Sequence, residues 1–194
     1  PYQLWDAGMT PLTSPPNQSP GVETADLVLA ARQGDAAALT ALVRQFQDMA
    51  VGYAWSLLGD FHLAEDAAQD AFIQVLGDLH SLREPAAFGG WLRRIVHKYC
   101  DRRTRRVGVR TVPLEGVVAQ VTADVTQTSA QDSLEQAETA AVVRRAIAAL
   151  PDAQRETITL FYMGERSQAQ VAVFLDITEG TVRKRLYDAR KALK

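Results

Sequence analysis

Two clusters of basic side chains carry the clearest chemical signal in this sequence. Eight Lys or Arg residues lie between positions 93 and 110 against one acid, Asp101, and six lie between 180 and 194 against Asp188 alone. Lys and Arg neutralise phosphates, and the Arg fork can also reach two acceptors on a guanine edge. Because the formal net charge of the whole chain is only −2, both clusters stand out from an otherwise acidic sequence. Their chemistry is that of nucleic-acid binding.

The C-terminal cluster lies on a predicted helix that follows a tight turn. Ser167 with Gln170 three residues later matches a capping box, which predicts a short helix over 168–175. Asp176 suits a turn that needs left-handed dihedrals, and Thr178 is a suitable N-cap for the last helix. On that helix the apolar residues share one face and the cations occupy the rest. This pattern predicts a helix-turn-helix whose second helix presents its N-terminal residues to base edges and its basic flank to phosphates. The residues expected to contact DNA are Thr181, Arg183, Lys184, Arg185 and Arg190.

The other basic cluster is interleaved with aromatic residues. Residues 88–103 read Phe-Gly-Gly-Trp-Leu-Arg-Arg-Ile-Val-His-Lys-Tyr-Cys-Asp-Arg-Arg. Aromatic and Arg planes stack on unpaired bases, with about 1–3 kcal/mol per base. We expect the apolar members Trp91, Leu92, Ile95 and Val96 to belong to the core. Arg94, Lys98 and Arg102 recur every four residues and are expected to form a nucleic-acid face.

A predicted helix over 63–79 carries acidic and amide side chains on one face. Asp66, Gln69 and Asp70 have the spacing that brings them together, and no Lys or Arg occurs from 45 to 82. Phe72, Val75 and Leu76 are available for burial. A face of acceptors without cations suits a cationic partner, and a merely solvated acidic face is the alternative.

The elements that position these side chains are predicted to be helices. Apolar residues fall at helical spacing from residue 26 onward, with breaks at Gly34-Asp35 and Gly59-Asp60. The expected fold is all-α, with two small helical domains joined by a flexible linker. The expected segments are a Pro-rich, disordered or extended tail (1–22), a first domain (23–107), the linker (108–136), and a second domain with the helix-turn-helix (137–194).

Composition argues against several classes of protein. The single cysteine, Cys100, and three scattered histidines do not form a metal-ligand cluster, so we expect neither a metal nor a cofactor. No apolar stretch approaches the roughly 20 residues of a membrane helix, and no signal peptide is evident, so a cytoplasmic protein without membrane insertion is expected. No nucleophile–base pair, phosphate-cradling glycine loop or paired-carboxylate site emerges, which argues against an enzyme.

Several motifs together resemble a known family. Residues 167–193 closely resemble the region of sigma-70-type factors that reads the minus-thirty-five promoter element, and residues 148–160 resemble the segment before it. Residues 64–72 are similar to the segment that binds the clamp helices of the largest RNA polymerase subunit. Residues 88–103 look like the element that melts and captures the minus-ten region. A linker stands where primary sigma factors have an additional domain, which is typical of the extracytoplasmic-function (ECF) type.

The resemblance implies partners and roles. The expected partners are bacterial core RNA polymerase, promoter DNA and an anti-sigma factor. The implied polymerase contacts are Asp66, Gln69 and Asp70. The implied minus-ten contacts are Arg83, Phe88, Arg94, His97, Lys98 and Arg102, and the implied minus-thirty-five contacts are the five residues of the last helix.

Three positions depart from the family pattern. Asp176 stands where Gly is usual, Asp188 where a basic residue is frequent, and His97 where Asn is common. The minus-ten preference of relatives therefore does not transfer to this chain.

Two other binding functions stay open at this point. A sigma-like decoy would sequester an anti-sigma factor without touching promoters, but it should have lost its basic faces. A stand-alone helix-turn-helix regulator would bind duplex DNA without polymerase. That function leaves the acidic face at 66–70 and the segment 88–103 without a role.

Overall fold

The computed structural model describes residues 20–107, 140–164 and 166–194. Its elements are α1 (Pro20–Arg32), α2 (Ala36–Leu58), α3 (Phe61–Asp78), the 3-10 turns η1 (Leu79–Ser81) and η2 (Pro85–Ala87), α4 (Phe88–Val107), a helix over 140–148, α6 (Asp152–Met163), α7 (Gln168–Leu175) and α8 (Glu179–Ala192). The described residues contain no strand, and the predicted all-α class is confirmed. The linker expected over 108–136 and the tail expected over 1–22 lie outside the described residues, apart from residues 20–22 at the start of α1.

Aspartate side chains begin helices α2 and α3 of the N-terminal domain. Asp35 accepts hydrogen bonds from the backbone N–H groups of Ala37 (2.8 Å) and Ala38 (3.1 Å), and Asp60 accepts one from Leu63 (2.9 Å). These bonds satisfy N–H groups that have no partner within the helix. Helix α2 ends at Gly59, whose φ of 68° lies in the left-handed region that glycine adopts without strain.

The N-terminal domain packs α2, α3 and α4 around one core. Small side chains on the inner face of α3 allow its neighbours to approach closely; they are Ala64, Ala67, Ala68 and Ala71, all buried. The prediction that Leu92, Ile95 and Val96 belong to the core is confirmed, while Trp91 is partly buried against it. Leu76 is 51% exposed, so its predicted burial is wrong. Only Val75 turns fully inward at that end of α3.

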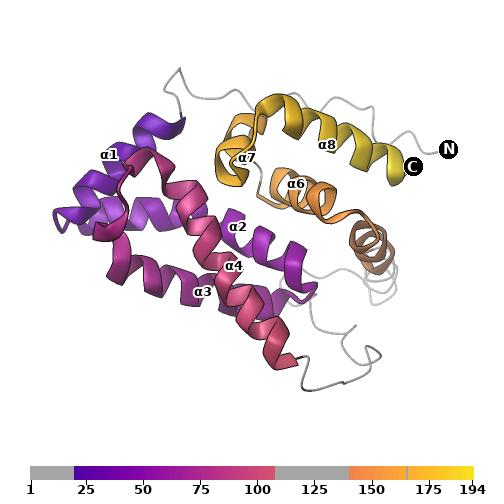
Figure 1. Ribbon diagram of the computed structural model, residues 1–194, viewed down its shortest axis with the longest axis horizontal. Helices are drawn as coiled ribbons and strands as arrows, with labels where there is room; N and C mark the ends of the chain where they lie inside the picture. The colour runs from indigo at the N-terminus through magenta and orange to yellow at the C-terminus, as the bar shows by residue number, and fades with distance from the viewer. Residues whose placement is uncertain (1–19, 108–139, 165) are drawn as a thin grey trace, which may run out of the picture.

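The C-terminal domain contains the predicted helix-turn-helix. Ser167 and Gln170 form the capping box at the start of α7, and Asp176 takes φ 57° and ψ 50° in the turn. Thr178 caps α8 by accepting a hydrogen bond from the Thr181 backbone N–H (3.2 Å). Val182, Leu186 and Ala189 are buried beneath α8, which holds the helix against α6 and α7. Figure 1 shows α8 running across α6 and α7.

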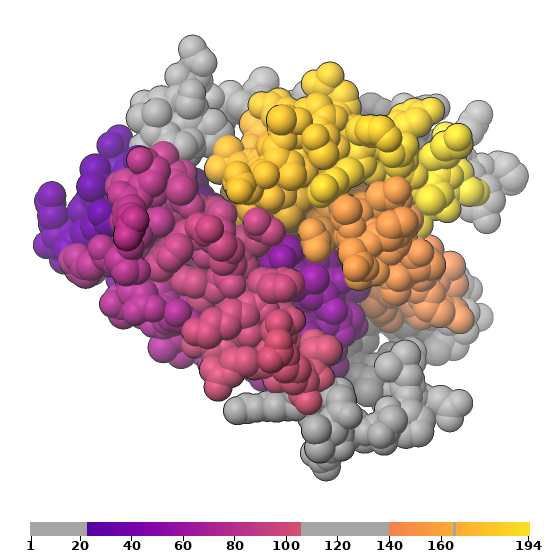
Figure 2. All heavy atoms as spheres, viewed as in Figure 1, coloured from indigo at the N-terminus to yellow at the C-terminus, as the bar shows by residue number. Residues whose placement is uncertain are grey.

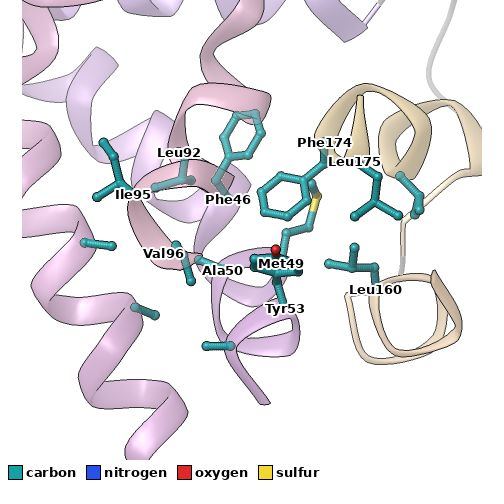
Figure 3. Packing of buried hydrophobic residues seen from close by; sticks show 14 of the residues in the cluster. Phe46, Met49, Ala50, Tyr53, Leu92, Ile95, Val96, Leu160, Phe174 and Leu175 are labelled. Carbon is teal, nitrogen blue, oxygen red and sulfur yellow. The ribbon is translucent and has the colours of Figure 1, made fainter. Parts of the chain in front are cut away.

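The two domains lie against each other and share one hydrophobic core. Met49 and Tyr53 of α2 meet Leu160 of α6 and Phe174 and Leu175 of α7 (Figure 3), and all five are buried. In Figure 2 the C-terminal helices sit directly on the N-terminal domain. Within the described residues, no helix has both the length and the apolar character needed to cross a membrane.

Candidate nucleic-acid and polymerase interfaces

Helix α8 presents its first turns to solvent. Arg183 and Lys184 are exposed, while Arg185 and Thr181 are half-buried. The Thr181 hydroxyl lies 2.9 Å from the capping hydroxyl of Thr178, so the local cap orients this side chain. These side chains lie at the N-terminal end of the second helix of the motif, the part that enters a major groove in helix-turn-helix proteins.

Arg190 is held by two aromatic rings at the other end of α8. Its Nε donates a hydrogen bond to the hydroxyl of Tyr162 (3.1 Å). Its guanidinium lies 5.7 Å from the Tyr162 ring centroid and 5.8 Å from that of Phe161, which is within cation–π range. Sequence patterns did not single out Tyr162, because the contact joins positions 28 residues apart on different helices.

The outer face of α4 carries the second group of exposed basic side chains. Arg94, His97, Lys98 and Arg102 are all exposed, and the last two lie 5.7 Å and 5.6 Å from the ring of Tyr99. Arg83 is exposed in the loop before η2. The structure therefore displays these five predicted minus-ten residues on the surface.

Phe88 is buried, so the prediction that it contacts DNA is wrong. Its side chain is 0% exposed and packs edge-on against Phe46, with ring centroids 5.0 Å apart. The Trp91 ring centroid lies 6.0 Å from that of Phe88. Phe88 therefore supports the start of α4 from below and has no surface to offer to a base.

The acidic face of α3 is exposed in part and paired in part. Asp66 and Gln69 are exposed, whereas Asp70 is half-buried and accepts a hydrogen bond from Arg103 of α4 (3.0 Å). A cation-free face was expected, so the Arg103 ion pair is a feature that only the fold reveals. Ile73 and Leu76 continue the same face and are 61% and 51% exposed.

Titratable groups gather where the two domains meet. The hydroxyl of Tyr53 lies 3.3 Å from Nδ1 of His97, and burial raises the pKa of Tyr53 with help from the nearby Glu156 carboxylate. Burial also raises the pKa of Glu156, and the guanidinium groups of Arg93 and Arg185 oppose that rise. Glu156 thus has basic neighbours on both predicted DNA-binding helices, Arg93 and His97 on α4 and Arg185 on α8.

A metal centre finds no support in the described part of the chain. None of its His, Cys, Asp and Glu side chains form a group of three or more that could hold an ion. The surfaces above consist of exposed basic side chains, aromatic rings and carboxylates.

Family models match both domains of the chain. The models for Sigma-70 region 2 and for Sigma-70 region 4 match residues 42–109 and 140–193. The ECF RNA polymerase sigma factor SigW of Bacillus subtilis is 31% identical over 172 residues, covering 84% of this chain and 90% of the relative. RNA polymerase sigma-H factor of Pseudomonas aeruginosa is 30% identical over 174 residues, covering 86% of this chain and 90% of the relative.

A solved structure shares the fold. It is the sigma factor RpoE in complex with the anti-sigma factor NepR from Bartonella quintana, with a TM-score of 0.52 at 23% identity, covering 79% of this chain and 92% of that one. This solved structure supports the all-α fold described above. The chain belongs to the sigma-70 family and is an RNA polymerase sigma factor of the ECF type.

Proposed function

We propose that this sigma factor docks on the clamp helices of core RNA polymerase through α3, captures the minus-ten strand with α4, and reads the minus-thirty-five element with α8. The observation that carries this division of labour is the display of one acidic and two basic exposed surfaces on three separate helices. Promoter-directed initiation by this chain would take place in the cytoplasm, where core polymerase acts.

The polymerase surface combines charge with exposed apolar area. Asp66 and Gln69 provide exposed hydrogen-bond acceptors, and Ile73 and Leu76 provide apolar side chains that are exposed to solvent in the free protein. Exposed large apolar residues next to polar ones are typical of a protein interface. Asp70 contributes to polymerase binding when its carboxylate also accepts a hydrogen bond from a polymerase cation, or exchanges Arg103 for that cation.

The minus-ten surface consists of Arg83, Arg94, His97, Lys98 and Arg102. Four of them lie on one face of α4, so they can follow a single strand, and Tyr99 lies beside two of them. Phe88 contributes only indirectly, because it fixes the position of the α4 N-terminus. Cations along a backbone together with an aromatic ring are the usual means of holding an unpaired strand.

The minus-thirty-five surface is the exposed side of α8. Arg183 is exposed near the N-terminal end of the helix. This is the part of the second helix that contacts base edges in such motifs, and an Arg fork can reach two acceptors on guanine. Arg190 lies near the opposite end, where Tyr162 and Phe161 hold its guanidinium in place. We assign Arg190 to a phosphate and Arg183 to a base.

An anti-sigma factor is a further proposed partner. The solved relative RpoE was crystallised with the anti-sigma factor NepR, and its fold matches this chain over most of its length. An anti-sigma factor that occupied α3 or the basic faces would block the contacts proposed above.

Run-off transcription with purified bacterial core polymerase tests the proposal. Wild-type protein should produce specific transcripts from a promoter library, and the Asp66→Arg/Asp70→Arg variant should lose them together with core binding. Glu23→Arg/Asp26→Arg is a matched control, because both carboxylates are exposed on α1 and the change in charge is the same. Core binding without transcripts would favour the decoy function, and DNA binding without core binding would favour a stand-alone regulator.

A further inference from the structure

One arginine joins the end of α1 to the segment 79–87, which connects α3 to α4. Arg32 is the last residue of α1, and its side chain is half-buried. Its Nε donates a hydrogen bond to the carbonyl of Leu79 (3.1 Å), and its Nη2 donates one to the carbonyl of Leu82. The partners lie 47 and 50 positions further along the sequence, so the two bonds attach segment 79–87 to a distant helix.

The two carbonyls suit a guanidinium group. Leu79 is the C-cap of α3, and the carbonyls at the end of a helix have no partner within it. They also form the negative end of the helix dipole, which favours a cation. Arginine carries five N–H donors in a fixed planar fork, so one side chain can bond to both carbonyls at once. Arg32 therefore fixes the direction in which the chain leaves α3.

Segment 79–87 is buried at its ends and exposed in its middle. The side chains of Leu79 and Leu82 are only 4% and 5% exposed, and Phe88, directly after the segment, is 0% exposed. The residues between these anchors that are exposed are Arg83, Glu84, Ala86 and Ala87. Arg83 directly follows the Leu82 carbonyl that Arg32 holds, and it belongs to the proposed minus-ten surface.

Helix α1 supports both 3-10 turns of this segment. It contacts η1 and η2, and Figure 1 shows the chain between α3 and α4 running beside it. Within η2 the Ala87 backbone N–H donates a hydrogen bond to the Glu84 carbonyl (3.0 Å), and the ring of Pro85 restricts its φ. The second half of the segment is thus ordered by its own turn, whereas the first half is attached through Arg32.

Attachment of this kind affects binding because an exposed loop is otherwise mobile. A loop side chain that must be ordered during binding lowers the affinity, and a loop that is ordered beforehand avoids that loss. Arg83 is exposed, so its position relative to α4 depends on how the backbone around it is held.

We propose that Arg32 is a positioning residue of the minus-ten surface, which holds segment 79–87 on α1 so that Arg83 has a defined place beside α4 before the single strand binds. Arg32 acts through Arg83 and does not itself contact DNA. This inference rests on the proposed function, because it concerns how one part of the minus-ten surface is built.

Strand binding by the holoenzyme tests the proposal. The probe is a fluorescent single-stranded oligonucleotide with the non-template minus-ten sequence of a promoter selected by run-off transcription. Arg32→Met should weaken its binding by about tenfold, because the apparent affinity falls with the fraction of chains whose loop is in place. Arg32→Lys keeps a charged donor but not the fork, so it should lose less affinity. Affinity for core polymerase and for duplex minus-thirty-five DNA should stay at the wild-type value.

Arg44→Met is the matched control. Arg44 is exposed on α2 of the same domain, so this variant has the same change in charge without the two carbonyl bonds being lost. It should bind the oligonucleotide as wild type does. An equal loss in Arg44→Met and Arg32→Met would overturn the proposal, because net charge alone would then explain the effect.

A double-mutant cycle with Arg83 separates positioning from a general effect on stability. Two changes that act through the same side chain are not additive. Arg32→Met should therefore cost about tenfold in affinity in the wild-type background and less than about twofold in the Arg83→Ala background. Equal losses in the two backgrounds would overturn the positioning role.

Hydrogen exchange of the free protein gives a readout that needs no DNA. Backbone amides of segment 79–87 should exchange faster in Arg32→Met than in wild type, while buried amides of α2 and α4 keep their protection. If Arg32→Met exchanges faster throughout, Arg32→Lys takes its place in the same comparison. Unchanged exchange in segment 79–87 would overturn the proposal. A wild-type holoenzyme that does not bind the oligonucleotide would instead overturn the proposed function, whatever the exchange of this segment shows.

Discussion

Replacing Phe88 by Ala should destabilise the protein without acting on DNA directly. The ring is fully buried at the start of α4, where it packs near the rings of Phe46 and Trp91. Removing a buried Phe costs about 3–5 kcal/mol, through lost transfer free energy and the cavity left behind. At about 2–4 °C per kcal/mol for a chain of this size, the melting temperature should fall by roughly 6–20 °C.

The edge-on contact between the two rings can be isolated by a double-mutant cycle. Phe46→Leu, Phe88→Leu and the double variant should show a coupling of about 0.5–1.5 kcal/mol, the value typical of aromatic pairs. Urea unfolding followed by circular dichroism gives the free energies of unfolding. Promoter binding by the holoenzyme, measured well below the melting temperature of Phe88→Leu, should stay at the wild-type value. A coupling near zero, or normal stability with reduced affinity for the minus-ten element, would refute the assignment of Phe88 to the core.

Three further predictions concern charged groups. Arg183→Gln should reduce the discrimination between bases at one promoter position by about 1–3 kcal/mol. Lys184→Gln should instead lower the holoenzyme's affinity for all promoters alike and reduce the slope of log affinity against log salt by about one. Binding assays over a salt series distinguish the two. Tyr162→Leu should release Arg190 and so lower the holoenzyme's affinity for duplex minus-thirty-five DNA. Tyr162→Phe keeps the ring and should lower that affinity less. An equal loss of affinity in the two variants would mean that the hydrogen bond alone positions the guanidinium. Because the folded-state pKa of Glu156 is raised from 4.5, the folded protein holds this proton more tightly than the unfolded chain does. Its contribution to stability is therefore full below about pH 4.5 and is lost as the pH rises through the raised pKa. Glu156→Gln should remove this decrease in the urea-derived stability above pH 4.5, and an unaltered pH profile would contradict the prediction.

Local signals in the sequence identified the helix-turn-helix because its determinants are close together. The capping box of Ser167 and Gln170, the left-handed Asp176 and the Thr178 cap each depend on groups within about four residues. Such hydrogen bonds form in the same way whatever the rest of the chain does. The structure accordingly has these features where the sequence predicted them.

Periodicity was less informative about which apolar side chain faces inward. The family resemblance placed Phe88 among the base contacts and it is core, whereas the helical pattern made Leu76 available for burial and it is exposed. A helical pattern gives relative directions around one axis, but the buried side depends on where neighbouring helices lie. Phe46, which covers Phe88, is 42 positions away and belongs to another helix.

The motifs and their order along the sequence predicted the family, the all-α fold and the candidate surfaces. Each of these predictions depends only on residue types and short spacings. Only tertiary structure decided which of those groups have partners. Asp70 forms an ion pair with Arg103, and Arg190 donates a hydrogen bond to Tyr162. Gly52 lies beside Met163, more than a hundred residues further along the chain. Such contacts depend on how whole helices pack against one another, and no local sequence pattern encodes that packing.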